Sequence, residues 1–518
     1  MALVDRLLTM VAQFSPIIDE TLRKYGDRPI KELLDSIKTN KVPPIQSRED
    51  LWNIIESEII PFFGEKIAHK ITCDLRLDPT VQTSNHYGID TAADSIQGTL
   101  LFLLRRGGNI FNRPFVVFGF SSISMNNNFS YPMGLQFYNH SSDQIVRLPQ
   151  KLPIFPNRLK KQVVYTAGPF DEKMVWRAQE RLIRMKKTEG LTTFSFNAIR
   201  NVLEEIFLDS YTLGLRNYGE QACIINNKLW HRSFKEKSAK SHFIQLQIEK
   251  ICKLLLYKDL KNSASLIFQL FFTNCVREKL INNLDGSKAC WKRKDLEQRY
   301  NQPDKSNQGG TVFFWGLTES GHRIPLVLKS QQSEKIFLGI SDRGQLFEVK
   351  FCADHIIAAL QAGTIIPSLF TCFAVLAFAR GIHCIGGYYQ AEYLPVIQGA
   401  IVDALNVSEA FRDMAESVAQ VPTRTCLAGL QYLALKRDDN SVVPIGPIEL
   451  AGVGGIRDID LETIPTLSIR DASLLAFTES LDQLVSNVEL PDNWVQKLSV
   501  ENGRMSGILT YCQHKELL

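Results

Sequence analysis

The stretch TSNHYGIDTAADSIQGTLLFLLRR, residues 83–106, joins a polar run directly to an apolar, helix-forming segment. His86, Asp90 and Asp94 are spaced four residues apart, so on one continuous helix they would share a face. An aspartate one turn from an imidazole can fix its tautomer and raise its basicity, as general-base chemistry requires. Gly88 interrupts the spacing, and the alternative is that Asp90 or Asp94 caps a helix that His86 precedes. Both arrangements place His86 beside a helix N-terminus, which favours an anionic substrate group.

The spelling HxxxD, from His86 to Asp90, resembles the histidine motif of CoA-dependent acyltransferases of the plant and condensation-domain type. The resemblance covers five residues. Thr91 replaces the glycine that usually follows the aspartate, and the motif lies earlier in this chain than in that family. FFWG at 313–316 is a poor counterpart of the family's second motif. The resemblance implies acyl transfer, with His86 as the general base.

A second polar segment, SISMNNNFSYP at 122–132, lies between two runs of strand composition, 113–123 and 131–138. Asparagine accepts left-handed backbone angles and bonds its own main chain, so a tight connection between strands explains the run. The same amides would also form a donor-rich wall for a sugar, carboxylate or amide substrate. The candidate binding residues here are Asn126, Asn127 and Asn128.

A third polar segment, RGIHCIGGYYQAEY at 380–393, follows a strongly apolar run. Its paired glycines, Gly386 and Gly387, predict a sharp turn between two buried helices. Hydrogen-bonding side chains at such a junction are costly to bury without partners, so they indicate either helix capping or a pocket. The candidate substrate-binding residues here are Arg380, His383, Tyr388, Gln390 and Glu392.

Composition excludes several classes of protein. The net charge of +4 over 518 residues is too small for a dedicated nucleic-acid binder. The most apolar segment, 364–379, contains Pro367 and is shorter than the ~20 residues that cross a bilayer, which predicts a buried helix in a soluble protein. Ten cysteines without a CxxC pair, and a start without a basic leader, are typical of a cytoplasmic protein with reduced thiols. No His/Cys cluster predicts a metal site, and no motif identifies a cofactor.

The predicted architecture is a mixed α+β fold, with a helical middle between two β-containing regions. The expected regions are 1–165, 166–305 and 306–518. In the third region, GTVFFWGL with RIPLVLK, and KIFLGI with QLFEVKF, each predict a β-hairpin. The middle region reads as almost wholly helical, with Ile244, Ile248, Ile251 and Leu255 in one apolar stripe.

Size, near-neutral charge and polar residues beside glycine turns favour a metabolic or biosynthetic enzyme acting on a polar or anionic small molecule. The expected general base is His86 with Asp90, and a homo-oligomer is compatible with this view. The alternative is a non-catalytic binding or assembly protein, in which the polar segments cap helices and turn the chain.

Overall fold

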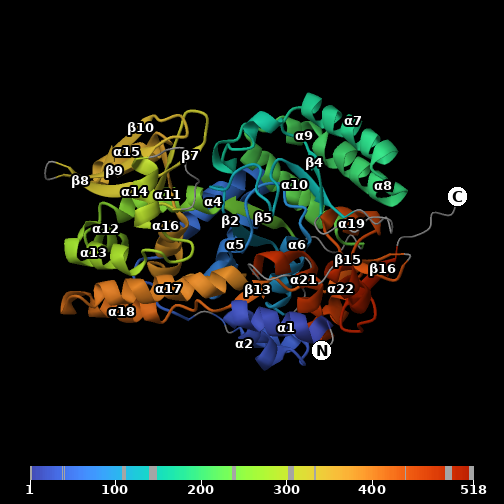
Figure 1. Ribbon diagram of the computed structural model, residues 1–518. Coiled ribbons are helices and arrows are strands. Elements are labelled where there is room, and N and C mark those ends of the chain that lie inside the picture. The colour runs from blue at the N-terminus through green and yellow to red at the C-terminus, as the bar shows by residue number, and fades with distance from the viewer. Residues whose placement is uncertain are drawn as a thin grey trace.

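A five-stranded parallel sheet lies at the centre of the computed structural model (Figure 1). The structure describes residues 3–37, 39, 41–107, 113–138, 149–235, 241–301, 309–331, 334–437, 439–484 and 493–512. In spatial order the strands are β13 (Cys426–Ala428), β12 (His383–Gly387), β1 (Thr80–Gln82), β2 (Phe115–Gly119) and β5 (Phe243–Gln247). All neighbouring strands run parallel. The carboxyl ends of all five therefore lie at one edge of the sheet.

The strand order reverses between β1 and β12. The chain begins in the middle with β1, adds β2 and β5 on one side, and returns to add β12 and β13 on the other. In open parallel sheets, the crevice beyond the carboxyl ends at such a switch point is where ligands bind. The sheet takes strands from all three predicted regions, so it joins them. The predicted boundary near 305 lies outside the described residues.

The strands are buried on both faces. Val116 and Phe118 of β2 belong to one hydrophobic core, and Phe115 and Val117 belong to another on the opposite face. Side chains alternate along a strand, so the continuous apolar run FVVFG supplies both cores at once. Burying one such side chain contributes roughly 1.5–3 kcal/mol.

Helices cover each face (Figure 1). The first core contains side chains of α4 (Glu49–Phe63), α5 (Glu65–Leu77), α11 (Ile248–Asp259) and α17 (Tyr388–Leu405). The second contains side chains of α6 (Ala93–Leu104) and α10 (Tyr218–Arg232). The helix α6 follows β1 and leads to β2, so it is the first crossover of the sheet.

The remaining helices surround this centre. They are α1 (Leu3–Phe14), α2 (Pro16–Tyr25), α3 (Ile30–Ser36), α7 (Glu172–Thr188), α8 (Thr193–Val202), α9 (Ser210–Leu213), α12 (Leu266–Phe272), α13 (Asn274–Asn283), α14 (Arg293–Asn301), α15 (Ala353–Gln361), α16 (Leu369–Phe373), α18 (Arg412–Ala419), α19 (Pro447–Gly452), α20 (Asp458–Thr463), α21 (Ile469–Leu484) and α22 (Trp494–Asn502). With helix at 53% and strand at 17%, the mixed composition is confirmed.

Smaller sheets complete the structure. The two predicted hairpins are confirmed: β6 (Phe314–Leu317) pairs antiparallel with β7 (Arg323–Pro325), and β9 (Glu334–Ile340) with β10 (Leu346–Lys350). The other strands are β3 (Gly134–Phe137), β4 (Gln150–Pro153), β8 (Val327–Gln331), β11 (Ile365–Pro367), β14 (Leu433–Lys436), β15 (Val442–Pro444) and β16 (Leu509–Cys512).

Three local predictions were wrong. Ile244 lies in β5 and not in a helical stripe, because the run FIQLQ pairs with β2 before α11 begins. Gly386 and Gly387 do not form a turn between helices; they end the strand β12, and α17 starts at Tyr388. The apolar segment 364–379 is largely buried as expected, but it opens with strand β11 before α16 and a π-helical turn.

Within the described ranges, no helix combines the length and apolar character needed to cross a membrane. The ten cysteines are all free, and five of them are buried.

Candidate functional site

Polar side chains from all three sequence segments follow the carboxyl ends of adjacent strands. Residues from Thr83 onward follow β1, Ser121 and Ser122 follow β2, and Tyr388 follows β12. Parallel pairing brings these positions to one edge of the sheet, although the segments are far apart in the sequence. The candidate site is therefore the carboxyl edge of the sheet, where these segments meet.

Thr83 and Gln390 join the first and third segments across the switch point. The Thr83 Oγ1 donates to Gln390 Oε1 over 3.0 Å, and Gln390 Nε2 donates to the carbonyl of Cys384 over 3.0 Å. Both side chains are buried. Gln390 thus ties the start of α17 to the loop that follows β1.

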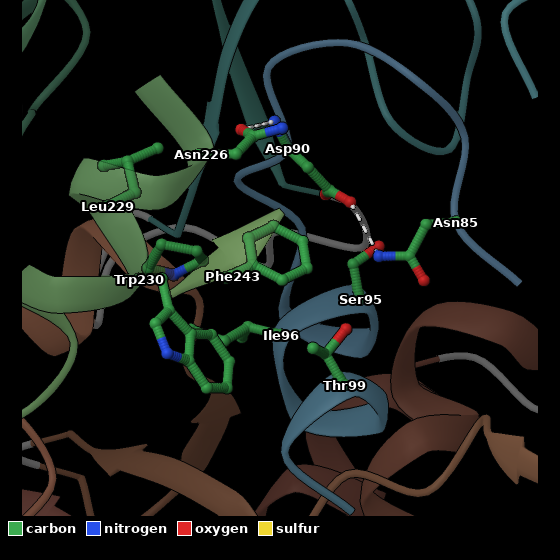
Figure 2. Close-up of a pocket in the computed structure, with 10 residues that line it drawn as sticks. Asn85, Asp90, Ser95, Ile96, Thr99, Asn226, Leu229, Trp230 and Phe243 are labelled. Atoms are coloured by element: carbon green, nitrogen blue, oxygen red, sulfur yellow. Dashed lines mark hydrogen bonds between the residues drawn. The ribbon is translucent and has the colours of Figure 1, made fainter. Parts of the chain in front are cut away.

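Asp90 lies in a cavity at the start of α6 (Figure 2). The helix begins at Ala93 with Ala92 as its N-cap, so neither the continuous helix face nor an aspartate cap is present. The Asp90 carboxylate accepts hydrogen bonds from Asn85 Nδ2 at 3.4 Å and from the Ala92 amide at 3.3 Å. The Asp90 amide donates to Asn226 Oδ1 at 2.9 Å.

This cavity is half polar and half apolar. Figure 2 shows Asp90 and Asn85 on the loop after β1, with Ser95 and Thr99 on α6. The apolar lining residues are Ile96, Leu229, Trp230, Phe243 and Pro447. The space open to the centre of a water molecule is about 20 Å³, enough for one water.

Burial changes the acidity of Asp90. Burial, with a smaller contribution from the nearby Asp94, raises the pKa of this carboxyl to about 7. Hydrogen bonds from Ser95, the Ala92 amide and Asn85 oppose the shift. Burial disfavours the charged form of a carboxyl, so Asp90 exchanges its proton near neutral pH.

Three more carboxyls form an acidic group with Asp90: Asp94 on α6, Glu449 on α19 and Glu479 on α21. Burial is the main cause that raises the pKa of Asp94, and it raises the pKa of Glu449 and of Glu479 to about 7. The Asp94 charge adds to the shift at Glu479, and Glu479 adds to that at Glu449.

Tyr138 connects two members of this acidic group. Its amide donates to Glu449 Oε1 at 2.8 Å, and its hydroxyl donates to Glu479 Oε1. Gln431 Nε2 donates to Glu479 Oε2. Glu449 and Glu479 were missed from the sequence because each lies inside an ordinary helical pattern, more than 350 residues after Asp90.

His86 lies on the same loop but makes separate contacts. Its ring meets Phe129 edge-on with 6.1 Å between centroids, and it is hydrogen-bonded to the Asn127 side chain. Burial lowers the pKa of His86 to about 4, and the Asn127 bond partly offsets that. His86 is thus neutral at pH 7, and it is a weaker base than an ordinary imidazole. Among the described residues, His86 and Asp90 share no hydrogen bond, and His86 does not line the Asp90 cavity.

The asparagine run both turns the chain and contacts His86. Asn127 Oδ1 accepts from the amides of Phe129 at 2.9 Å and Ser130 at 3.3 Å, which is the side-chain turn expected of asparagine. The same side chain reaches His86. Asn126 and Asn128 are exposed. The structure therefore brings the first and second segments together through Asn127.

The other residues of the third segment lie elsewhere. Arg380 precedes β12 and His383 begins it, so both are at the amino edge of the sheet. All five Arg380 N–H groups are engaged by Asp50, Asp259 and a backbone carbonyl, which leaves none for a substrate. His383 bonds Thr425 Oγ1 at 2.8 Å.

Glu392 is one turn beyond Tyr388 on α17. Its carboxylate accepts from Ser15 Oγ at 2.7 Å and from Lys288 Nζ at 2.9 Å. Glu392 thus links α2 and the segment before α14 to α17, and its described contacts are structural.

Glu249 fixes the carboxyl ends of β2 and β5 relative to each other. Its fully buried carboxylate accepts from the Ser121 amide at 2.9 Å, the Ser121 hydroxyl at 2.7 Å and the Ser122 amide at 2.7 Å. Backbone amides that could bind an external anion are therefore occupied by the protein's own carboxylate.

In the described part of the chain, no three His, Cys, Asp or Glu side chains are close enough to hold a metal ion. The chain matches no protein-family model, no curated protein and no solved structure. The function of the site is therefore inferred from the residues that form it.

Proposed function

We propose that this protein is an enzyme acting on a polar or anionic small molecule at the carboxyl edge of the five-stranded sheet. Asp90 serves as proton donor and acceptor. The observation that carries the proposal is a buried carboxyl with a pKa of about 7, on the loop after β1, in a cavity lined by α6 and α10. A group with a pKa near the working pH is suited to general acid–base catalysis, and such shifts concentrate at active sites.

The size of the cavity sets how Asp90 would act. Its space for one water molecule suits proton exchange with a substrate directly at the cavity mouth or through a single water. The negative charge of the nearby Asp94 makes Asp90 hold its proton more tightly.

His86 is the second proposed base, as the HxxxD resemblance implies for acyl or group transfer. Its neutral ring can take a proton from a hydroxyl or thiol nucleophile, while Asn127 orients it. His86 and Asp90 contact different partners, so we assign them separate roles rather than a hydrogen-bonded pair.

The alternative is a non-catalytic binding or assembly protein. Two observations favour it: the Asp90 cavity is small, and a chain of hydrogen bonds runs from Gln82 through Asn85 to Asp90. A buried polar network of this kind can serve packing alone.

The purified full chain, incubated with a cell-metabolite extract and followed by mass spectrometry, distinguishes the two. The enzyme proposal expects time-dependent loss of one metabolite and gain of another. Asp90→Asn keeps the shape of the side chain but cannot exchange a proton, so it should slow that conversion at least about 100-fold. Conversion at the wild-type rate by folded Asp90→Asn removes Asp90 from catalysis, and the absence of any conversion supports the binding protein.

A further inference from the structure

A second cavity, of about 520 Å³, lies between α7 and the β3–β4 hairpin. One wall is a face of α7, which forms the outer layer at the upper right of Figure 1. The opposite wall is the end of β4 and the turn after it, from Pro153 to Asn157. Asn126 and Tyr131, on either side of the asparagine turn, close the third side. No residue lines both this cavity and the Asp90 cavity.

Three arginines of α7 line this cavity: Arg177, Arg181 and Arg184. Their spacing of four and three residues places them on one side of the helix. None forms an ion pair with any residue that the structure describes, and Glu180 is the one carboxylate among the described lining residues. Like charges one turn apart repel each other, so this face gains stability from an anion that neutralises it.

The remaining lining provides an apolar surface. Met133, Ile154 and Phe155 face the cavity beside the charged wall. Tyr131 adopts a left-handed backbone angle, φ 43°, which is uncommon for an aromatic residue. Strained backbone of this kind collects at ligand sites, where the surrounding structure holds it in place.

We infer that this cavity binds a phosphorylated small molecule, with the phosphate on Arg177, Arg181 and Arg184 and the organic part on Met133, Ile154 and Phe155. A guanidinium group binds a phosphate through two parallel N–H bonds. A phosphate has enough oxygens to bind several guanidinium groups at once, whereas a carboxylate has room for one or two. The volume lies in the range of small-molecule sites. The assignment is independent of the proposed catalytic role of Asp90.

Isothermal titration of the full chain tests the assignment with matched ligand pairs: adenosine monophosphate with adenosine, and a hexose phosphate with the hexose. At least one phosphorylated probe should bind at least about tenfold more tightly than its partner, since one charge-assisted bond is worth that much. Arg181→Gln should weaken that binding at least about tenfold, and Glu180→Gln should tighten it.

Lys187→Gln is the control, because this exposed residue of α7 does not line the cavity. It should leave the affinity unchanged, and all three variants should keep the wild-type melting temperature since the altered side chains are exposed. Equal affinity of wild type and Arg181→Gln would overturn the assignment. The assignment would also be overturned if no phosphorylated probe bound at millimolar concentration, or if single-stranded RNA bound in place of the small phosphates.

Discussion

Replacing Asp90 by asparagine should remove the pH dependence that its buried carboxyl imposes on stability. The native pKa is about 7 and the ordinary value is 3.8. Between these values the native state holds a proton that the unfolded state has released, so stability falls as pH rises. A difference of about three pKa units corresponds to about 4 kcal/mol, lost between roughly pH 4 and pH 7.

Asparagine carries no charge, so it does not incur this loss. It does place an amide N–H opposite the Asn85 donor, which costs roughly 1–3 kcal/mol at every pH. Asp90→Asn should therefore be less stable than wild type near pH 4 and more stable at pH 8. The hydrogen-bond cost is the same at both pH values. The stability difference between variant and wild type should therefore change by about 4 kcal/mol from pH 4 to pH 8, and this change reports the pKa shift alone.

Urea unfolding followed by circular dichroism at pH 4, 6 and 8 measures this difference. Asp27→Asn is the control: Asp27 is exposed, and its variant should keep a constant offset from wild type. A constant offset for Asp90→Asn as well would refute the reasoning, because it would mean that Asp90 is ionised in the native state throughout. Combined with loss of activity, higher stability at pH 8 marks a residue kept for function at the expense of stability.

The remaining predictions concern three other positions. Asn127→Asp should raise the pKa of His86, and Asn127→Gly should lower it, as measured by NMR titration of the imidazole. Equal values would show that the turn alone explains Asn127. Arg380→Ala should destabilise by about 3–5 kcal/mol in thermal unfolding, since it leaves two carboxylates without their cation; a shift below about 1 kcal/mol would contradict this. Glu249→Gln turns an N–H toward the Ser121 amide and should cost about 1–3 kcal/mol in urea unfolding. A neutral result would show that the side chain readily rearranges.

Local signals allowed part of the fold to be predicted. The β6–β7 and β9–β10 hairpins combine strand composition with glycine-containing turns, and their partners are neighbours in sequence. Strand β1 has three residues, TVQ, and β12 contains two glycines, so neither carries a recognisable alternating pattern. Their partners are distant in sequence, and no local pattern encodes a pairing of that kind.

The candidate site, too, could be predicted only in part from the sequence. His86, Asp90 and Asn127 were found because each lies in a polar run beside apolar segments, and the structure gathers them on adjacent loops. Arg380 belongs to a similar polar run, yet its side chain crosses to Asp50 and Asp259 at the other edge. Composition shows that a polar group needs a partner, but not whether that partner is a substrate or the protein itself.

The pairing of Thr80 with His383 has a consequence for synthesis on the ribosome. The apolar strands β1, β2 and β5 emerge first, but one side of β1 stays unpaired until β12 is made. Exposed strand edges of that kind are prone to aggregation and are commonly shielded by chaperones. A nascent chain that stops before β12 lacks half of the switch point, so it cannot assemble the Thr83–Gln390 contact. The crevice at the switch point thus becomes complete only after β12 and the start of α17 have been made.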